Sequence, residues 1–488
     1  MKMRFLLLLL LLFALFTVVF TLPRLLEKER VPVPSVQTTE PQTETLEEKS
    51  FPYETAWGET ESRRPFEPDY KPGEPVKREK LPAHILFASD IHYMSRSLTD
   101  YGNAFHELID NGDGKAVRYM PQIWDAFAGE VIAAQPDALV LSGDLTINGE
   151  RVNHEELAAH LSVIEAAGVP VVVIPGNHDI NNPYATAYFG DEQSFIETVT
   201  PEEFWQFYQN FGYGEAASYA PDSMSYLYIL NDTTWLLMLD TCIYTPENRV
   251  GGELRPGTMK WIEQCLQEAY AQGITVLPVG HHNLQELSRV YVEECVLQNH
   301  DEALALFERY LTPAYFSGHL HVQRIMKHKT EPGVPDEVYG IWEIVSNSLI
   351  IPPCRYGSLT LHVDGSMSYH TKSVDVSGFA AANGETNPDL LDFSAFSDRY
   401  IHSVIRRQIY DSLEDLPDYI KESLADFYAE LYRDYNAGRQ INYSERKKEP
   451  GYAWWDRFMN PSIQFRQVEG MMRDGMSVNH NAEIPSPY

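Results

Sequence analysis

The chain has 488 residues with a hydrophobic content of 44%, enough for a sizeable core and for more than one domain. It carries 38 Lys and Arg against 70 Asp and Glu, a net charge of −32. Surfaces that bind nucleic-acid polymers are basic, so no such partner is expected. None of the four cysteines forms a CxxC pair, which argues against a cysteine zinc site and favours buried free thiols over disulfides.

Residues 1–22 form an apolar segment that predicts a membrane anchor or a signal segment. Phe5 to Leu22 is 18 residues without a charge, close to the length of a membrane span. The following "VVFTLPR" offers no small-residue cleavage site, so an uncleaved anchor is favoured over a cleaved signal, which would release a secreted protein. Basic residues lie on both sides of the segment and do not fix its orientation. The short N-terminus resembles that of a signal anchor and predicts that the bulk of the chain lies outside the cytoplasm.

A stalk is expected over residues 23–80, which are rich in Pro, Glu and Thr. Such a composition buries too little apolar surface to order itself, and its prolines favour extended chain. The pattern changes at Leu81, where a globular domain is predicted to begin and to continue to residue 375.

Within 81–375, short apolar runs such as "HILFASD", "DALVLSGD" and "VPVVVIPGN" alternate with amphipathic segments. One helix is expected where Asn153 can cap its start and Gly168 its end, with His154 and His160 on a solvated face. "SYLYILNDTTWLLML" predicts a hairpin instead. The alternation therefore predicts an α/β domain built as a mixed-sheet β-sandwich flanked by helices.

Residues 376–488 are predicted to form a separate helical C-terminal domain. Ile420, Leu424, Phe427 and Leu431 recur at helical spacing, and Gly438 ends the run.

Five polar clusters lie at the ends of predicted strands. They are "SDIHY" with Asp90 and His92, "SGDL" with Asp144, "GNHD" with Asn177, His178 and Asp179, "GHH" with His281, and "GHLH" with His319 and His321. In α/β sheets, ligands collect beyond the carboxyl ends of strands, so these ends can converge on one site.

The residue types in these clusters point to metal binding. Carboxylates, an amide oxygen and several imidazoles together suit divalent Mn, Fe or Zn, with Mn or Fe favoured. Residues two apart on a strand share a face, so each of the pairs Asp90 with His92 and His319 with His321 can converge on one ion or straddle two. Since adjacent strand residues point opposite ways, His281 is preferred over its neighbour His282.

The series D-x-H, G-D-x-x-x-x-G, G-N-H-D, G-H and G-H-x-H resembles the calcineurin-like metallophosphoesterase superfamily over roughly residues 84–322. "GDLTINGE", "IDNGDGKAVRY" and the helical C-terminus look most like bacterial class III cyclic-nucleotide phosphodiesterases with an added helical domain. The resemblance implies a four-layer metallophosphoesterase domain over 81–375. It also implies a first metal held by Asp90, His92 and His321, a second held by Asn177, His281 and His319, and Asp144 bridging the two. His178 is left off the metals as a catalytic acid, and Asp179 is positioned to orient its ring.

The expected function is a dinuclear-metal phosphoric ester hydrolase in which a metal-bound hydroxide attacks a small phosphodiester, such as a cyclic nucleotide. Two alternatives stay open. One is a phosphomonoesterase, or a hydrolase of phospholipid or cell-wall phosphate. The other is a non-catalytic surface protein on the same fold. Resemblance to a fold does not by itself determine the substrate or the activity.

Overall fold

The computed structural model describes residues 72–329, 339–414 and 416–487. The predicted anchor and residues 23–71 of the predicted stalk lie outside these residues. None of the described helices is long and apolar enough to cross a membrane. All four cysteines are buried and free, as expected.

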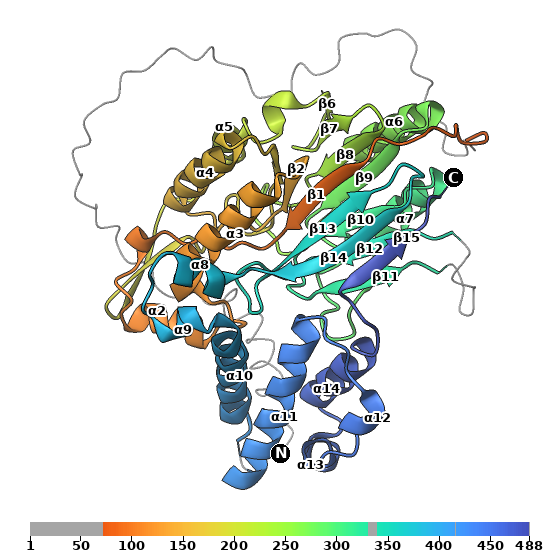
Figure 1. The fold of residues 1–488 in the computed structure, drawn as a ribbon. Helices are drawn as coiled ribbons and strands as arrows, with labels where there is room; N and C mark the ends of the chain where they lie inside the picture. The colour runs from red at the N-terminus through yellow and green to blue at the C-terminus, as the bar shows by residue number, and fades with distance from the viewer. Residues whose placement is uncertain (1–71, 330–338, 415, 488) are drawn as a thin grey trace, which may run out of the picture. The chain divides into compact units, whose positions relative to one another are not determined.

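In the described residues, the strands form two large mixed sheets and a small hairpin (Figure 1). The first sheet has the order β15 (Asn481–Ile484), β14 (Met367–Ser373), β13 (Arg355–Leu361), β1 (Ala83–Ala88), β2 (Ala138–Ser142), β3 (Val171–Ile174). The second has the order β11 (Arg324–Lys327), β12 (Trp342–Val345), β10 (Ala314–Ser317), β9 (Thr275–Gly280), β8 (Thr234–Leu239), β7 (Tyr226–Asn231), β6 (Ser218–Tyr219). The separate hairpin is β4 (Thr186–Phe189) with β5 (Glu192–Phe195).

The helices lie outside the two sheets or follow them in the chain. They are α2 (Asn103–Asp110), α3 (Met120–Ala134), α4 (Arg151–Ala166), α5 (Pro201–Tyr208), α6 (Pro256–Gln272), α7 (His300–Arg309), α8 (Val376–Ala382), α9 (Pro388–Leu391), α10 (Phe393–Ser412), α11 (Asp418–Asn436), α12 (Tyr443–Arg446), α13 (Pro450–Trp454) and α14 (Ile463–Asp474).

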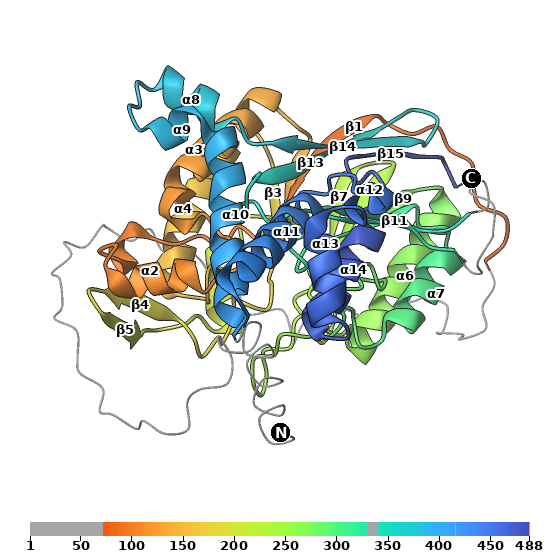
Figure 2. The ribbon, with the colours of Figure 1, turned by 90° about the horizontal axis from the view of Figure 1, so that it is seen from below.

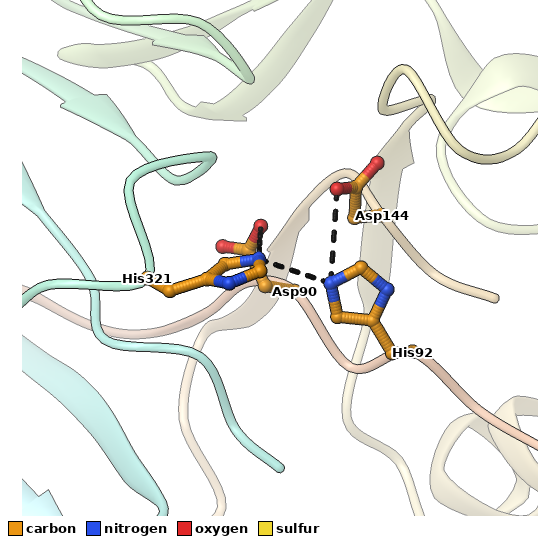
Figure 3. Close-up of side chains that lie close together, drawn as sticks. All are labelled: Asp90, His92, Asp144 and His321. Carbon is orange, nitrogen blue, oxygen red and sulfur yellow. Dashed lines mark hydrogen bonds and ion pairs between the residues drawn. The ribbon is translucent and has the colours of Figure 1, made fainter. Parts of the chain in front are cut away.

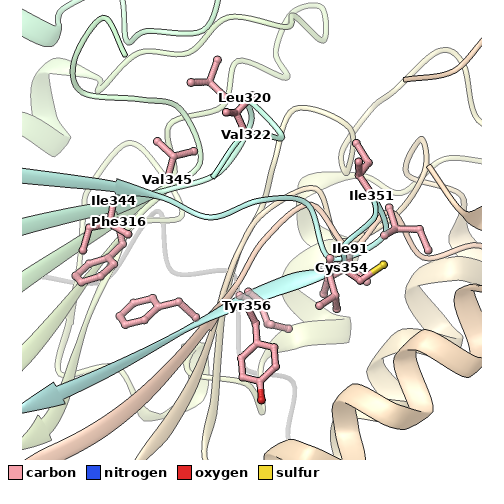
Figure 4. Packing of buried hydrophobic residues seen from close by; sticks show 14 of the residues in the cluster. Ile91, Phe316, Leu320, Val322, Ile344, Val345, Ile351, Cys354 and Tyr356 are labelled. Atoms are coloured by element: carbon pink, nitrogen blue, oxygen red, sulfur yellow. The ribbon is translucent and has the colours of Figure 1, made fainter. Parts of the chain in front are cut away.

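The main core lies between the two sheets, because one side of each is apolar. Phe87 of β1 stacks on Phe316 of β10 with ring centroids 4.0 Å apart. Phe316 and Ile344 of β12 belong to the same buried cluster (Figure 4). A second cluster packs α6 and α7 against the other side of β8 and β9. The predicted mixed-sheet sandwich with flanking helices is therefore confirmed, and so is the hairpin, which forms β7 and β8.

Parallel pairing explains how the domain can build a site at one edge. β1, β2 and β3 run parallel to one another in the first sheet, and β8, β9, β10 and β12 run parallel in the second. The carboxyl ends of parallel neighbours lie at the same edge, where polar loops can meet.

The C-terminal helices follow the predicted periodicity. Ile420, Leu424, Phe427 and Leu431 are all buried on α11, and α10 lies beside α11 in both ribbon views (Figures 1 and 2). The sequence assigned everything from residue 376 onward to this helical domain. In the structure, β15 returns to the first sheet and pairs antiparallel with β14.

Two expectations about α4 were wrong. The helix begins at Arg151, before the proposed cap Asn153, and His154 is buried rather than solvated. Its ring Nδ1 lies 2.8 Å from the hydroxyl of Tyr208, because α5 covers that face of α4. His160 is half-buried, with its Nε2 3.2 Å from the hydroxyl of Tyr93.

Candidate metal centre

The predicted ligands all follow the carboxyl ends of parallel strands. Asp90 and His92 follow β1, Asp144 follows β2, Asn177 follows β3, His281 follows β9, and His319 and His321 follow β10. The structure brings these seven residues, from both sheets, into two adjoining clusters.

The first cluster contains Asp90, His92, Asp144 and His321, each of which offers a ligand atom within 4.8 Å of the others (Figure 3). His321 Nε2 lies 3.2 Å from Asp90 Oδ1 and 3.0 Å from His92 Nε2. The same His92 nitrogen lies 3.8 Å from Asp144 Oδ2. Two imidazole nitrogens and two carboxylate oxygens therefore converge on one point.

The second cluster shares Asp144 with the first and adds His281 and His319, again within 4.8 Å. His281 Nε2 lies 3.4 Å from Asp144 Oδ2 and 3.1 Å from the amide oxygen of Asn177. Its Nδ1 lies 2.9 Å from Ser142 O, an acceptor, which fixes the proton on Nδ1 and leaves Nε2 for the cluster.

His282 uses both ring nitrogens outside this cluster, although its ring centroid lies 4.6 Å from that of His319. Its Nε2 lies 2.7 Å from Val250 O and its Nδ1 2.8 Å from the hydroxyl of Thr241. Both ring nitrogens are thus engaged elsewhere, and His281 is the member of the pair that reaches Asp144.

The backbone of the two clusters is itself unusual. Five of the seven residues have a positive φ, which is uncommon for residues other than glycine and concentrates at functional sites. They are Asp90 (51°), His92 (44°), Asp144 (48°), His319 (69°) and His321 (56°). These conformations aim the side chains inward, at a cost that the surrounding fold must offset.

Two glycines permit the close packing of the loops. A Cβ on Gly176 would collide with the backbone nitrogen and the carboxylate of Asp144. A Cβ on Gly318 would collide with Ser89 and would lie 2.6 Å from the Asp90 carboxylate. The glycines in "PGN" and "SGH" therefore let one loop approach the ligands of another.

The electrostatics of the clusters fit two cations. Burial alone would lower the pKa of His281, but Asp144 outweighs it and raises the pKa to about 9. Burial and Lys115 would lower the pKa of His321, yet Asp90 and Asp113 raise it to about 9. The buried carboxylate beside each ring thus favours a positive charge, which a bound metal ion would supply. Burial lowers the pKa of His92 well below its usual value and that of His319 to about 3, so both rings are neutral, the form that binds metals.

His178 lies beside the clusters and outside them. Its backbone N–H donates to Asp144 Oδ1 at 2.9 Å, while its ring Nδ1 lies 2.6 Å from Ile147 O and 2.9 Å from Asn148 Oδ1. Because a carbonyl only accepts, Nδ1 carries a proton, and Nε2 lies on the Asp144 side, 3.9 Å from Oδ2. Burial lowers the pKa of this imidazole.

Asp179 does not take the role that the sequence suggested for it. Its two carboxylate oxygens accept from the backbone N–H groups of Gly176, Leu145 and Thr146 at 2.8–3.0 Å. They bind the turn after β2 to the turn after β3, whereas Ile147 and Asn148 hold the His178 ring. A backbone carbonyl partner leaves no trace in a sequence motif, so this arrangement could not be predicted.

One site residue was missed altogether. Asp113 Oδ2 lies 2.7 Å from His321 Nδ1, across 208 positions of sequence. The segment "IDNGDGKAVRY" indicated only a resemblance to the subfamily. Nothing in its sequence shows which of its acidic residues contacts a distant histidine.

Two family models match the chain. Calcineurin-like phosphoesterase matches residues 83–323, and the C-terminal domain of cyclic nucleotide phosphodiesterase matches residues 375–477. The first model contains all seven clustered residues together with His178.

Two curated relatives match the chain at low identity. The glycerophosphodiester phosphodiesterase GpdQ of Enterobacter lignolyticus (strain SCF1) is 27% identical over 243 residues, 49% of this chain and 70% of that protein. The metallophosphoesterase-like protein YydB of Bacillus subtilis (strain 168) is 24% identical over 212 residues, 38% of this chain and 41% of that protein. A dimetal phosphatase from Danio rerio is 13% identical with a TM-score of 0.44, over 62% of this chain and 97% of that one, too distant to bear on function. From the family model and the clustered residues together, residues 83–323 form a calcineurin-like phosphoesterase domain.

Proposed function

We propose that the chain hydrolyses phosphodiesters with the aid of two divalent cations. The observation that carries this proposal is the pair of clusters joined by Asp144, which offers one carboxylate to both. Asp90, His92 and His321 would hold one cation, and Asn177, His281 and His319 the other. The nitrogen and oxygen donors suit Mn or Fe first and Zn second.

Two cations at this site would neutralise charge on the phosphoryl oxygens and lower the pKa of a water molecule toward neutrality. The chain's own residues supply the rest. Asp144 and the imidazoles fix the site before substrate arrives, which avoids reorganisation during the reaction. His178 lies beside Asp144 with its Nδ1 bound to Ile147 O, so only Nε2 can exchange a proton with substrate. In its protonated form, Nε2–H would donate to the departing oxygen.

A diester is favoured over a monoester because an alkoxide leaving group needs such a proton. The Enterobacter relative is a glycerophosphodiester phosphodiesterase, and the C-terminal region matches the C-terminal domain of cyclic nucleotide phosphodiesterase, which supports the same choice. We propose a small diester, such as a cyclic nucleotide, as the substrate class.

The test is a substrate panel with the purified protein, stripped of metal and reloaded with Mn²⁺, Fe²⁺ or Zn²⁺. The panel contains 3′,5′- and 2′,3′-cyclic nucleotides, glycerophosphodiesters, bis-p-nitrophenyl phosphate and p-nitrophenyl phosphate. The Asp90→Asn variant serves as the inactive control for contaminating enzymes. We expect the diesters to give the higher kcat/KM. A preference for the monoester would replace this proposal with a phosphomonoesterase, and hydrolysis no faster than that of the control would favour the non-catalytic alternative.

We also propose that residues 1–22 anchor the chain in the membrane, with the metal centre on the extracytoplasmic side. The support is the uncharged segment from Phe5 to Leu22 and the absence of a cleavage site after it.

A further inference from the structure

The loop that carries Asp113 connects α2 to the start of α3 and lies against His321. Asp113 Oδ2 is 2.7 Å from His321 Nδ1, and both carboxylate oxygens bind the Lys115 ammonium at 2.9 and 3.0 Å. Because His321 presents its other nitrogen to Asp90, the Asp113 contact fixes the orientation of the ring. A carboxylate on the far nitrogen of a metal-binding histidine also makes that histidine a stronger ligand.

Side chains of the C-terminal helices hydrogen-bond to the backbone of this loop. Its backbone carbonyls accept from three side chains of α10 and α11: Tyr432 to Asp113 (3.2 Å), Tyr400 to Lys115 (2.8 Å), and Gln408 to Asp110 (2.8 Å) and Gly112 (2.7 Å). The loop also fits tightly, because a Cβ on Gly114, where φ is +95°, would lie 3.1 Å from Ile401 of α10. The loop therefore depends on these helices for its position.

The backbone that carries His321 is held by the same region. The Asn347 side chain donates to His321 O at 2.7 Å and to Asn436 O at 3.3 Å. The carbonyl of Asn436, the last residue of α11, also accepts from the backbone N–H of Gln323 at 2.9 Å. The end of α11 thus contacts the His321 loop, while the Asp113 loop contacts the His321 ring.

We propose that Asp113 is a positioning residue for His321, and that α10 and α11 set the metal affinity of the first cluster through it. The C-terminal domain would then belong to the metal centre without supplying a ligand. This inference rests on the metal centre of the proposed function and is independent of the substrate.

The test measures Mn²⁺ binding to the metal-free, full-length protein by calorimetry, with no substrate present. Asp113→Ala should weaken one of the two sites by about 10- to 100-fold and leave the other near its original affinity. Asp113→Asn keeps an acceptor oxygen without the charge and should cause a smaller loss. Thermal unfolding of each metal-free variant checks that the fold is retained.

Tyr432→Phe removes only the hydroxyl that donates to Asp113 O, and should weaken the same site by about 2- to 10-fold, the effect of one hydrogen bond. Tyr428→Phe is the matched control, since it lies one turn earlier on α11 and bonds Gln467 of α14 at 3.0 Å. It should leave both affinities unchanged. In an Asp113→Ala background, Tyr432→Phe should add no further loss, because its effect passes through the Asp113 side chain.

Wild-type affinity at both sites in Asp113→Ala would overturn the positioning role. If that variant does not fold, unchanged binding in both Asp113→Asn and Tyr432→Phe would overturn it equally. A further loss from Tyr432→Phe in the Asp113→Ala background would overturn the path through Asp113. A wild-type protein that binds two Mn²⁺ ions but cleaves no ester would refute the proposed function and leave this inference standing.

Discussion

Replacing His178 with alanine separates proton donation from metal binding. The substitution removes the ring and keeps the backbone N–H that donates to Asp144 Oδ1 at 2.9 Å, so the bridging carboxylate keeps its support. The ring lies outside both ligand clusters, with its Nε2 3.9 Å from Asp144 Oδ2. We therefore expect His178→Ala to retain two metal ions per chain and to lose activity on substrates with poor leaving groups.

The size of the loss follows from the protonation of the ring. A well-placed general acid contributes about 10²–10⁴-fold. Burial lowers the pKa of His178, so the neutral ring predominates near pH 7.5 and the protonated ring becomes more common as the pH falls. The expected loss for an alkoxide leaving group near pH 7.5 therefore lies toward the lower end of this range, about 10²-fold. Because the imidazolium fraction rises as pH falls, the ratio of wild-type to variant activity should grow between about pH 7.5 and pH 6.5.

The assay compares kcat/KM for a cyclic nucleotide and for bis-p-nitrophenyl phosphate, with Mn²⁺ saturating, across that pH range. p-Nitrophenolate leaves without help, so its diester should be much less affected. His160→Ala is the control, because this half-buried ring contacts Tyr93 and lies on α4. Equal losses on both substrates, or a ratio that falls toward acid pH, would refute proton donation by His178. A lost metal ion would make His178 a ligand instead.

Three further outcomes are expected. Asp144→Asn should lower the bound Mn²⁺, measured by elemental analysis, more than His92→Ala does, because Asp144 belongs to both clusters; equal losses would argue against a shared ligand. Burial raises the pKa of Glu343 from 4.5 to about 8. As the pH rises from 4.5 to about 8, the free energy of unfolding of the wild type should therefore fall relative to that of Glu343→Gln, by up to about 1.4 kcal/mol per pH unit. The same pH dependence of urea unfolding in both proteins would contradict this. Protease added to intact protoplasts should release an active fragment from the membrane fraction, and protection of the metal centre would place it in the cytoplasm.

The parts of the fold that could be predicted are those with local signals. Apolar runs that end in glycine and polar residues marked β1, β2, β3, β9 and β10, and the spacing from Ile420 to Leu431 marked α11. The seven clustered residues could be proposed together because each lies within a few positions of a strand end, where chain direction already determines its neighbours.

Contacts between distant segments could not be read in this way. His154 resembles any polar residue on an amphipathic helix until α5 is placed over it. Asp113 contacts His321 because the loops that carry these two residues pack together with α10 and α11. The spacing of residues within either loop does not predict this packing. The partner of His178 is a backbone carbonyl, which every residue possesses.

The pairing of β15 with β14 makes the C-terminal helices an insertion within a β-hairpin. Met367 lies opposite Ile484 and His370 opposite Asn481, so the chain leaves the sheet after Ser373 and re-enters beside it. A truncation after residue 375 would therefore also remove an edge strand, whereas joining the two strands by a short turn would remove the helices and keep the sheet. During synthesis, β15 leaves the ribosome only after the helices between β14 and β15 have been made, so the first sheet cannot be completed before them.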